Sequence, residues 1–309
     1  MATTKHLNTF MQNTNKILMI RPAAFTYNAQ TAGNNLFQVA GKADNAQENA
    51  LKEFDAFVAL LKKNGVDVTV IDDTPQPHTP DSIFPNNWIS FHENETEILY
   101  PMYAENRRAE RKQHVQEIIN RNFNKTNIID LTGFEKENLF LEGTGSMVLD
   151  RENKMAYACI SPRTSKKVLN VFCETMNYKP CSFSAKDENE NEIYHTNVMM
   201  CVADKFVVIC LESITDNAEK QYVINTIKST SKEIISISLH QMNSFAGNMI
   251  QLKNTTGEKL LIMSQQAYES LTLTQITLLE KYNQLVYADL KTIETNGGGS
   301  ARCMIAEVF

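Results

Sequence analysis

The sequence contains no apolar run long enough to cross a membrane and no segment typical of a secretory signal. Its longest apolar runs, such as residues 206–211, have the length of one β-strand, whereas a transmembrane helix needs about 20 apolar residues. The first residues, 1–15, are polar and lack the apolar centre of a signal peptide. We therefore expect a cytoplasmic protein without a membrane partner, with residues 1–15 as an N-terminal tail.

Basic residues are not in excess. Lys and Arg total 30 against 36 Asp and Glu, which gives a net charge of −6, and the two signs are interspersed. A mildly acidic chain without a basic stripe argues against a nucleic-acid partner.

Paired cysteines and dense groups of metal-binding side chains are also missing. The six cysteines form no CxxC pair, and no group of His, Asp and Glu has the spacing of metal ligands. We expect neither a metal nor another cofactor. Five cysteines lie in or beside apolar segments and are interpreted as reduced core residues: Cys159, Cys173, Cys181, Cys201 and Cys210.

What the chain does contain is a repeated pattern of strand, strand, helix and strand. Its 309 residues, 42% of them apolar, can form one large domain or two ordinary ones. Apolar runs and periodicity predict strands at 16–22, 66–71, 88–92, 97–101, 127–131, 145–149, 155–160, 180–184, 196–202, 205–211, 233–238, 248–252, 259–264, 284–289 and 303–309. They predict helices near 45–64, 105–122, 166–177, 216–229 and 274–282. The last strand could close a ring beside the first.

The loops that join these units follow one another at a nearly constant step. Asn87, Glu142, His195, Gly247 and Cys303 are separated by 55, 53, 52 and 56 residues. Such a step indicates repeated supersecondary units around an axis. In a closed ring these five loops would meet at one end, and side chains far apart in sequence would converge.

The C-terminal loop is the most informative segment. Three glycines, Gly297–Gly299, are expected outside any helix or strand, where they let the backbone turn and approach a ligand closely, with Gly298 at the centre of the run. Cys303 follows and is expected to open an apolar strand. A thiol at such a junction would be both accessible and rigidly held.

The run from Gly297 to Met304 resembles the C-terminal motif of the guanidine-modifying enzymes of the pentein fold. These include arginine deiminases, dimethylarginine dimethylaminohydrolases and amidinotransferases. The resemblance extends from about Arg21 to the C-terminus. It implies a five-bladed α/β propeller of ββαβ units, formed as a single catalytic domain over residues 16–309, with Cys303 as the nucleophile.

Further motifs match the family in order. The segment 141–145, LEGTG, resembles the loop whose carboxylate, here Glu142, orients the catalytic histidine. The segment 194–197, YHTN, resembles the loop that supplies this histidine, here His195. The resemblance also implies that Arg163, in SPRT, and Arg108, in NRRAE, bind a substrate carboxylate. FPNNW, at 84–88, stands where the family usually has an F-x-x-D loop, so Asn86 and Asn87 are expected at the substrate.

These side chains suit hydrolysis at a guanidino or ureido carbon. That carbon is a poor electrophile, and a thiolate divides its hydrolysis into two easier steps through a covalent intermediate. His195 can protonate the departing amine and then activate water. Glu142 can accept the other imidazole N–H and fix the tautomer.

Two positions depart from the deiminases, which grip the guanidinium with aspartates. Here both are asparagine, Asn87 and Asn197. A buried cation needs carboxylates, whereas an asparagine offers a donor and an acceptor without net charge. The change favours a neutral ureido group, and two arginines favour an amino acid. Citrulline fits both, and the chain resembles a branch of citrulline hydrolases.

Other functions stay open at this point. An arginine or N-acylarginine deiminase or dihydrolase is one alternative, because a related dihydrolase of N-succinylarginine also has asparagine near the guanidine. An amidinotransferase-like enzyme and a non-catalytic pentein binding protein are others. The sequence does not determine the order of amine release. It does not determine the oligomeric state either, so a homo-oligomer stays open.

Overall fold

The computed structural model describes residues 11–35, 37–38 and 45–309. Its strands form five separate sheets of three strands each. The strands are β1 (Lys16–Arg21), β2 (Asp67–Asp72), β3 (Ile89–His92), β4 (Thr96–Leu99), β5 (Asn127–Asp130), β6 (Val148–Asp150), β7 (Met155–Cys159), β8 (Lys179–Phe183), β9 (Met200–Val202), β10 (Phe206–Ile209), β11 (Glu233–Ser236), β12 (Ile250–Lys253), β13 (Lys259–Ser264), β14 (Gln284–Ala288) and β15 (Ala306–Val308).

All five sheets have the same topology. The middle strand pairs antiparallel with the strand before it in the unit and parallel with the strand after it; the strand orders are β15-β1-β2, β3-β4-β5, β6-β7-β8, β9-β10-β11 and β12-β13-β14. A parallel pair needs a crossover, and here each crossover contains a helix. The predicted strand–strand–helix–strand repeat is confirmed.

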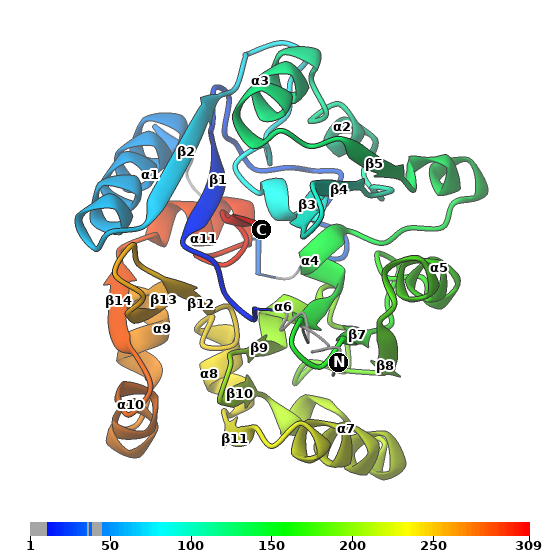
Figure 1. The fold of residues 1–309 in the computed structure, drawn as a ribbon, viewed down its shortest axis with the longest axis vertical. Coiled ribbons are helices and arrows are strands. Elements are labelled where there is room, and N and C mark those ends of the chain that lie inside the picture. The colour runs from blue at the N-terminus through cyan, green and yellow to red at the C-terminus, as the bar shows by residue number, and fades with distance from the viewer. Residues whose placement is uncertain (1–10, 36, 39–44) are drawn as a thin grey trace, which may run out of the picture.

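The longer helices lie on the outside of the molecule (Figure 1). The crossovers between parallel strands contain α1 (Ala46–Lys63), α2 (Glu105–Arg108), α3 (Gln113–Phe123), α5 (Lys166–Met176), α7 (Asn217–Ser229), α9 (Gln265–Ser270) and α10 (Leu273–Glu280). The other helices are α4 (Gly143–Ser146), α6 (Thr196–Met199), α8 (Leu239–Asn243) and α11 (Lys291–Gly297), and 3₁₀ turns lie at Pro85–Asn87, Thr132–Glu137 and Leu211–Ser213.

The sheets follow one another around a common centre in chain order (Figure 1). The last strand, β15, pairs antiparallel with β1, with Lys16 opposite Val308, so the two ends of the chain share one sheet. The predicted pairing of the last strand with the first is thereby confirmed. Among the described residues no ladder of hydrogen bonds joins one sheet to the next.

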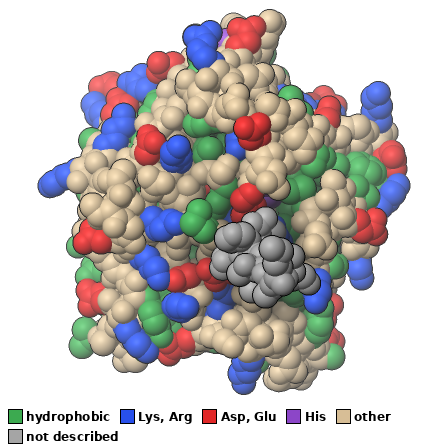
Figure 2. Space-filling model, viewed as in Figure 1, with side chains coloured by type: hydrophobic (Ala, Val, Ile, Leu, Met, Phe, Trp, Pro, Cys, Tyr) green, Lys and Arg blue, Asp and Glu red, His purple; other side chains and the backbone are tan. Residues whose placement is uncertain are grey.

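Four clusters of buried apolar side chains form the core of the described part, and each joins elements of neighbouring units. The units therefore stabilise one another rather than standing alone. On the face shown in Figure 2, acidic and basic side chains are mixed. No helix within the described ranges has both the length and the apolar character needed to span a bilayer.

The structure corrects four expected elements. The helix expected over 105–122 is interrupted, with α2 ending at Arg108 and α3 beginning at Gln113. The strands expected from 145 and from 196 begin with the short helices α4 and α6. Cys303 lies in a turn, and the strand begins only at Ala306. Local tertiary contacts, described below, override the apolar pattern at each place.

Part of the expected N-terminal tail is bound to the ring. Residues 1–10 lie outside the described residues. Gln12 is buried, and its Nε2 donates to the carbonyls of Leu149 and Val202. Asn13 donates to Gln251, and Thr14 donates to the carbonyl of Val308.

Candidate active site

Two asparagines hold the sulfur of Cys303. Cys303 is 4% exposed and lies in the turn between α11 and β15. The Nδ2 of Asn197 is 3.4 Å from its Sγ, and the Nδ2 of Asn248 is 3.3 Å away. The thiol is therefore buried among amide groups and is less accessible than its position in the sequence indicated.

His195 and Glu142 form a buried hydrogen-bonded pair. His195 precedes α6 and Glu142 precedes α4. The Nε2 of His195 lies 2.7 Å from one oxygen of Glu142, and the other oxygen accepts from the backbone N–H of Tyr103 at 2.9 Å. This pairing leaves the Nδ1 of His195 as the nitrogen available to a substrate.

The surroundings set opposite protonation tendencies in this pair. Burial lowers the pKa of His195 to about 4, although its bond to Glu142 opposes this shift. Burial would raise the pKa of Glu142, but Arg163 and the bond from His195 outweigh burial and lower it to about 2. At neutral pH the pair is a neutral imidazole and a carboxylate, the state in which His195 can accept a proton at Nδ1.

Gly145 makes room for this histidine. A Cβ atom at Gly145 would lie 2.8 Å from the Nδ1 of His195 and 2.3 Å from the Nδ2 of Asn87. Real Cβ contacts are not that short, so any side chain at Gly145 would displace both groups. The helical turn α4 is what brings the Gly145 backbone there.

Asn87 and Asn197 each present one polar atom without a partner. The Oδ1 of Asn87 accepts from Nη1 of Arg107 at 2.8 Å, while its Nδ2 is buried and has no hydrogen-bond partner. The Oδ1 of Asn197 is likewise buried and unpaired. Unpaired buried polar atoms are costly. An unpaired donor on a residue that lines the cavity and an unpaired acceptor on a residue that contacts the Cys303 sulfur therefore indicate a polar ligand.

Asn86 faces a neighbouring loop. Its Nδ2 is 3.4 Å from the Oγ1 of Thr144, and its Oδ1 is buried without a partner. It is not one of the residues that line the cavity beside Cys303. That cavity is lined by Asn35, Asp81, Phe84, Asn87, Arg107, Arg163, Tyr194, His195, Gly297, Gly298, Gly299 and Cys303.

The structure brings Arg163 to the cavity but not Arg108. Arg163 is buried, donates to Asn34 and to the carbonyl of Thr31, and has Nη1 3.6 Å from Glu142. Arg108 instead donates to the carbonyls of Met102 and Tyr103, away from the cavity. Its neighbour Arg107 lines the cavity.

The glycine run is only partly a loop. Gly297 is the last residue of α11, and Gly298 follows in the left-handed conformation with φ 64°. The carbonyl of Gly298 accepts from the hydroxyl of Tyr194 at 2.7 Å. The run ends a helix and lines the cavity with backbone.

Several lining residues were not predicted from the sequence. Asp81 is buried with one oxygen unpaired, and Arg107 lies 3.8 Å from the other. Asn248 was missed although Gly247, one residue earlier, belongs to the evenly spaced loops. Asn35 has no signal in the sequence, and Tyr194 has only its place beside His195, so the fold is what identifies them.

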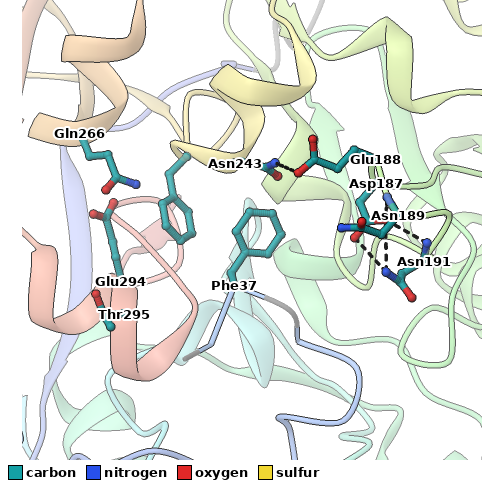
Figure 3. Close-up of a pocket in the computed structure, with 10 residues that line it drawn as sticks. Phe37, Asp187, Glu188, Asn189, Asn191, Asn243, Gln266, Glu294 and Thr295 are labelled. Atoms are coloured by element: carbon teal, nitrogen blue, oxygen red, sulfur yellow. Dashed lines mark hydrogen bonds between the residues drawn. The ribbon is translucent and has the colours of Figure 1, made fainter. Parts of the chain in front are cut away.

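A larger cavity, of about 500 Å³, lies elsewhere (Figure 3). Asp187, Glu188 and Glu294 give it an acidic lining, and Phe37 points into it. None of the residues predicted from the sequence lines it. Within the described part of the chain, no group of three or more His, Cys, Asp or Glu side chains could hold a metal ion.

A family model describes nearly the whole chain. The model for N,N dimethylarginine dimethylhydrolase, eukaryotic, matches residues 21–309. The chain belongs to this family. The resemblance to the guanidine-modifying enzymes is thereby confirmed, whereas its citrulline-hydrolase branch is not tested by the match. Among curated protein sequences the chain has no match.

Solved structures of guanidine-modifying enzymes share the fold of this family member. A variant of the N-terminal domain of ArgZ, covalently bound to a reaction intermediate, matches with a TM-score of 0.74 and 19% identity, over 95% of this chain and 97% of that domain. ArgZ is an arginine dihydrolase of cyanobacteria. An adduct of dimethylarginine dimethylaminohydrolase with S-methyl-L-thiocitrulline matches at 0.63 and 16% identity, over 96% of this chain and 99% of that one.

AgrE, in a complex with ornithine and NAD⁺, has a TM-score of 0.74 and 18% identity over 95% of this chain. This chain spans 39% of AgrE and 40% of the longer ArgZ chain. At such identities the likeness is one of fold.

Proposed function

We propose that the chain is a hydrolase of a C–N bond in a ureido or guanidino amino acid, with Cys303 as nucleophile and His195 as acid and base. The observation that carries the proposal is that Cys303 and the buried His195–Glu142 pair meet at one cavity. Nucleophilic catalysis needs a thiol with a base nearby and a third group that orients the base. Membership of a hydrolase family supports the same reaction.

Each step of this reaction has a residue to serve it. The sulfur of Cys303 forms a bond to the ureido carbon, and the bond from that carbon to one nitrogen breaks. His195 takes the proton of the Cys303 thiol at Nδ1 and gives it to the departing amine. It then takes a proton from water, which attacks the same carbon, and returns it to the sulfur as the C–S bond breaks. The carbamate released in this way decomposes into the second amine and carbon dioxide. Glu142, ionised throughout, stabilises the imidazolium that forms within each step while His195 holds the transferred proton.

Citrulline is the substrate that the amide groups favour. The free Nδ2 of Asn87 can donate to a urea oxygen, and the free Oδ1 of Asn197 can accept from a urea N–H. A guanidinium has donors only, so it would leave the Asn87 donor unpaired. Hydrolysis of citrulline gives ornithine, carbon dioxide and ammonia.

The other end of the substrate faces charged residues. Arg163 lines the cavity, and its Nη1 makes no hydrogen bond within the described residues and lies 3.6 Å from Glu142. We propose that it binds the substrate carboxylate. Arg107 lines the same cavity, so it replaces Arg108 as the second arginine in this proposal.

A second candidate is hydrolysis of arginine. Asp81 supports it, because this buried carboxyl lines the cavity and keeps one oxygen unpaired. Two arginine-related structures, of ArgZ and of AgrE with L-arginine, also share the fold. Arginine would place a cation beside Asn87, whose Oδ1 already accepts from the guanidinium of Arg107.

We further propose that residues 16–309 form one catalytic domain in which the five units close as a propeller. The pairing of β15 with β1 supports closure. A cytoplasmic location is also proposed, since all six cysteines are free thiols, which suits a reducing compartment.

One assay tests the reaction and the substrate together. Ammonia is measured with citrulline, arginine, N-acetylarginine and agmatine, together with the amine left from each (ornithine, ornithine, N-acetylornithine and putrescine), and kcat/KM is compared. We expect citrulline to exceed arginine at least tenfold, because a single hydrogen bond to a desolvated group is worth about 1.5 kcal/mol. Cys303→Ser should abolish turnover, whereas Cys173→Ser, a buried cysteine in α5, should retain it.

The outcomes separate the proposals. Equal or higher kcat/KM with arginine would replace citrulline by the second candidate and leave the cysteine mechanism intact. Turnover by Cys303→Ser would overturn that mechanism. No turnover of any compound by the wild-type protein would favour a binding protein of the same fold.

A further inference from the structure

One of the five evenly spaced loops, the fourth in chain order, has no role in the reaction described so far. Four of these loops supply Asn87, Glu142, His195 and Cys303, and the remaining one contains Gly247. The next residue, Asn248, is 1% exposed and lies just before β12. It therefore occupies, in its own unit, the place that the catalytic residues occupy in theirs.

Gly247 allows this loop to approach the histidine loop closely. A Cβ atom at Gly247 would lie 2.3 Å from the carbonyl oxygen of Val198 and 2.7 Å from the carbonyl carbon of Met199. Backbone atoms cannot give way to that extent. The absence of a side chain thus lets Asn248 reach Asn197, whose carbonyl accepts from the Nδ2 of Asn248 at 2.8 Å.

The orientation of the Asn248 amide is fixed by its neighbours. Its Oδ1 accepts from the backbone N–H of Arg302 at 3.0 Å, and one Nδ2 hydrogen goes to the Asn197 carbonyl. If the amide were flipped, its NH₂ group would face the N–H of Arg302 and its oxygen would face the carbonyl of Asn197. The second Nδ2 hydrogen therefore has to point toward the Cys303 sulfur, 3.3 Å away.

Asn197 differs from Asn248 in this respect. Its Nδ2 is also near the sulfur, at 3.4 Å, but its Oδ1 has no partner to fix it. It is free to turn toward a substrate. Asn248 has no free polar atom left for a substrate, so the sulfur is the one reacting group that its amide contacts.

We propose that Asn248 is a further catalytic residue, which stabilises the Cys303 thiolate by donating an amide hydrogen to it. The same side chain holds the cysteine turn through Arg302. In the protonated state the thiol can instead donate to the Asn248 Oδ1, which is 3.7 Å from the sulfur. Loss of the thiol proton moves the contact from Oδ1 to Nδ2 within one rigid amide.

The role of Asn248 depends on the proposed hydrolase function in one respect, the expected effect of its variants on turnover. The contact itself determines how readily Cys303 ionises, which can be measured without a substrate. Iodoacetamide alkylates the thiolate, so its rate as a function of pH reports ionisation. Alkylation of Cys303 is followed by mass spectrometry of its peptide.

The decisive variant is Asn248→Asp, which keeps an acceptor for Arg302 and removes both donors. We expect the pH midpoint of Cys303 alkylation to rise by at least one unit, equivalent to about 1.4 kcal/mol. The alkylation rate at pH 7 should fall about tenfold or more. With the preferred substrate, kcat should fall while KM stays nearly constant.

Asn283→Asp is the matched control, because Asn283 is also buried and bonded on both sides, to Leu279 and Gln251, away from the sulfur. Its alkylation profile should equal that of the wild type. Asn248→Ala provides a second variant without an added carboxylate and should shift the midpoint in the same direction. A wild-type midpoint in a folded Asn248 variant would overturn the proposal, whatever the assay of the wild-type enzyme shows about the substrate.

Discussion

The charge on the His195–Glu142 pair is decided by several groups that act against one another. Burial favours neutral forms of both residues. Glu142 favours a charged His195, whereas Arg163 and Arg107 disfavour it. The same two arginines favour a charged Glu142. The balance leaves one negative charge on the pair, with two arginines facing it.

This balance predicts a specific dependence of stability on pH. The pKa of His195 falls from 6.5 in the unfolded chain to about 4 in the folded protein. Between these values the unfolded chain binds one more proton, so stability falls as the pH falls. We expect the free energy of unfolding to drop by up to about 1.4 kcal/mol per pH unit from this residue.

His195→Gln isolates this contribution, since glutamine can still donate to Glu142 but does not titrate. Urea denaturation of both proteins at several values between pH 4 and 7 gives the difference in unfolding free energy. That difference should shrink steadily below pH 6.5 as the wild type loses stability. A constant difference across this range would mean that His195 is not held neutral by the fold.

Single residues of the site could be predicted where a motif names them, and could not where two neighbours compete. Cys303, His195, Glu142, Asn87 and Asn197 were predicted and are found around one sulfur or in contact with its neighbours. Of two consecutive arginines, Arg108 was predicted to reach the site, but Arg107 is the one that lines the cavity. Consecutive residues on a helix point about 100° apart, and a charged run does not reveal which one is buried.

At the scale of elements, the strands were predictable from their short apolar runs, and most of them are buried, although β5 has no buried residue. The short helices α4 and α6 were not, because Gly145 and Thr196 begin apolar segments that look like strands. A tertiary contact favours the helical turns over strands. The hydroxyl of Thr196, in α6, donates to the carbonyl of Ser146, in α4 of the neighbouring unit. Sequence periodicity contains no information about such a partner.

The break between α2 and α3 has a similar cause. Arg107 turns inward to pair with Glu110 at 2.8 Å, and Lys112, the last residue of the break, reaches Asp73 at 2.7 Å. All four side chains are nearly inaccessible. The chain leaves the helix so that these charges can pair in the interior, although the sequence alone has the composition of a solvated helix.

The end of α11 leads to a prediction about Gly298. Its φ of 64° is unfavourable for a side chain, and a Cβ atom there would lie 2.5 Å from Asn35. Gly298→Ala should lower the unfolding free energy by about 1 kcal/mol for the conformation alone. It should also lower kcat/KM, because the clash lies in the lining of the cavity.

The control is Gly133→Ala, where a Cβ atom would meet nothing within 4 Å. Both variants are compared by urea denaturation and by the product assay. Unchanged stability and activity for Gly298→Ala would show that neither the turn nor Asn35 restricts this position.

At the scale of the whole molecule, five loops meet because the five units are held around a centre, and the chain ends help to hold them. Within the described residues, no ladder of backbone hydrogen bonds joins one of the five sheets to the next. Other contacts must fix their relative positions. The segment from Gln12 to Thr14 bonds to elements of several units, although its polar sequence led us to expect a tail.

Gln12 is the clearest case and yields the last prediction. Its side chain accepts from the backbone N–H of Arg151 at 2.8 Å and donates to the carbonyls of Leu149 and Val202 at 2.9 and 3.1 Å. These bonds join β6 and its following turn to β9, in the next unit.

Gln12→Ala leaves three buried backbone groups without partners, and each such group costs about 1–3 kcal/mol when water cannot reach it. The cavity left behind can admit water, so we expect a loss of about 1–3 kcal/mol in total. Gln113→Ala is the control, because Gln113 is exposed on α3 and its side chain donates to Glu117 in the same helix. Its effect should stay within about 0.5 kcal/mol. Turnover per folded molecule should be equal in both variants, since Gln12 does not line the cavity beside Cys303. If Gln12→Ala were as stable as Gln113→Ala, the N-terminal segment would be a tail as the sequence indicated, and the units would be held together by their other contacts, the apolar clusters among them.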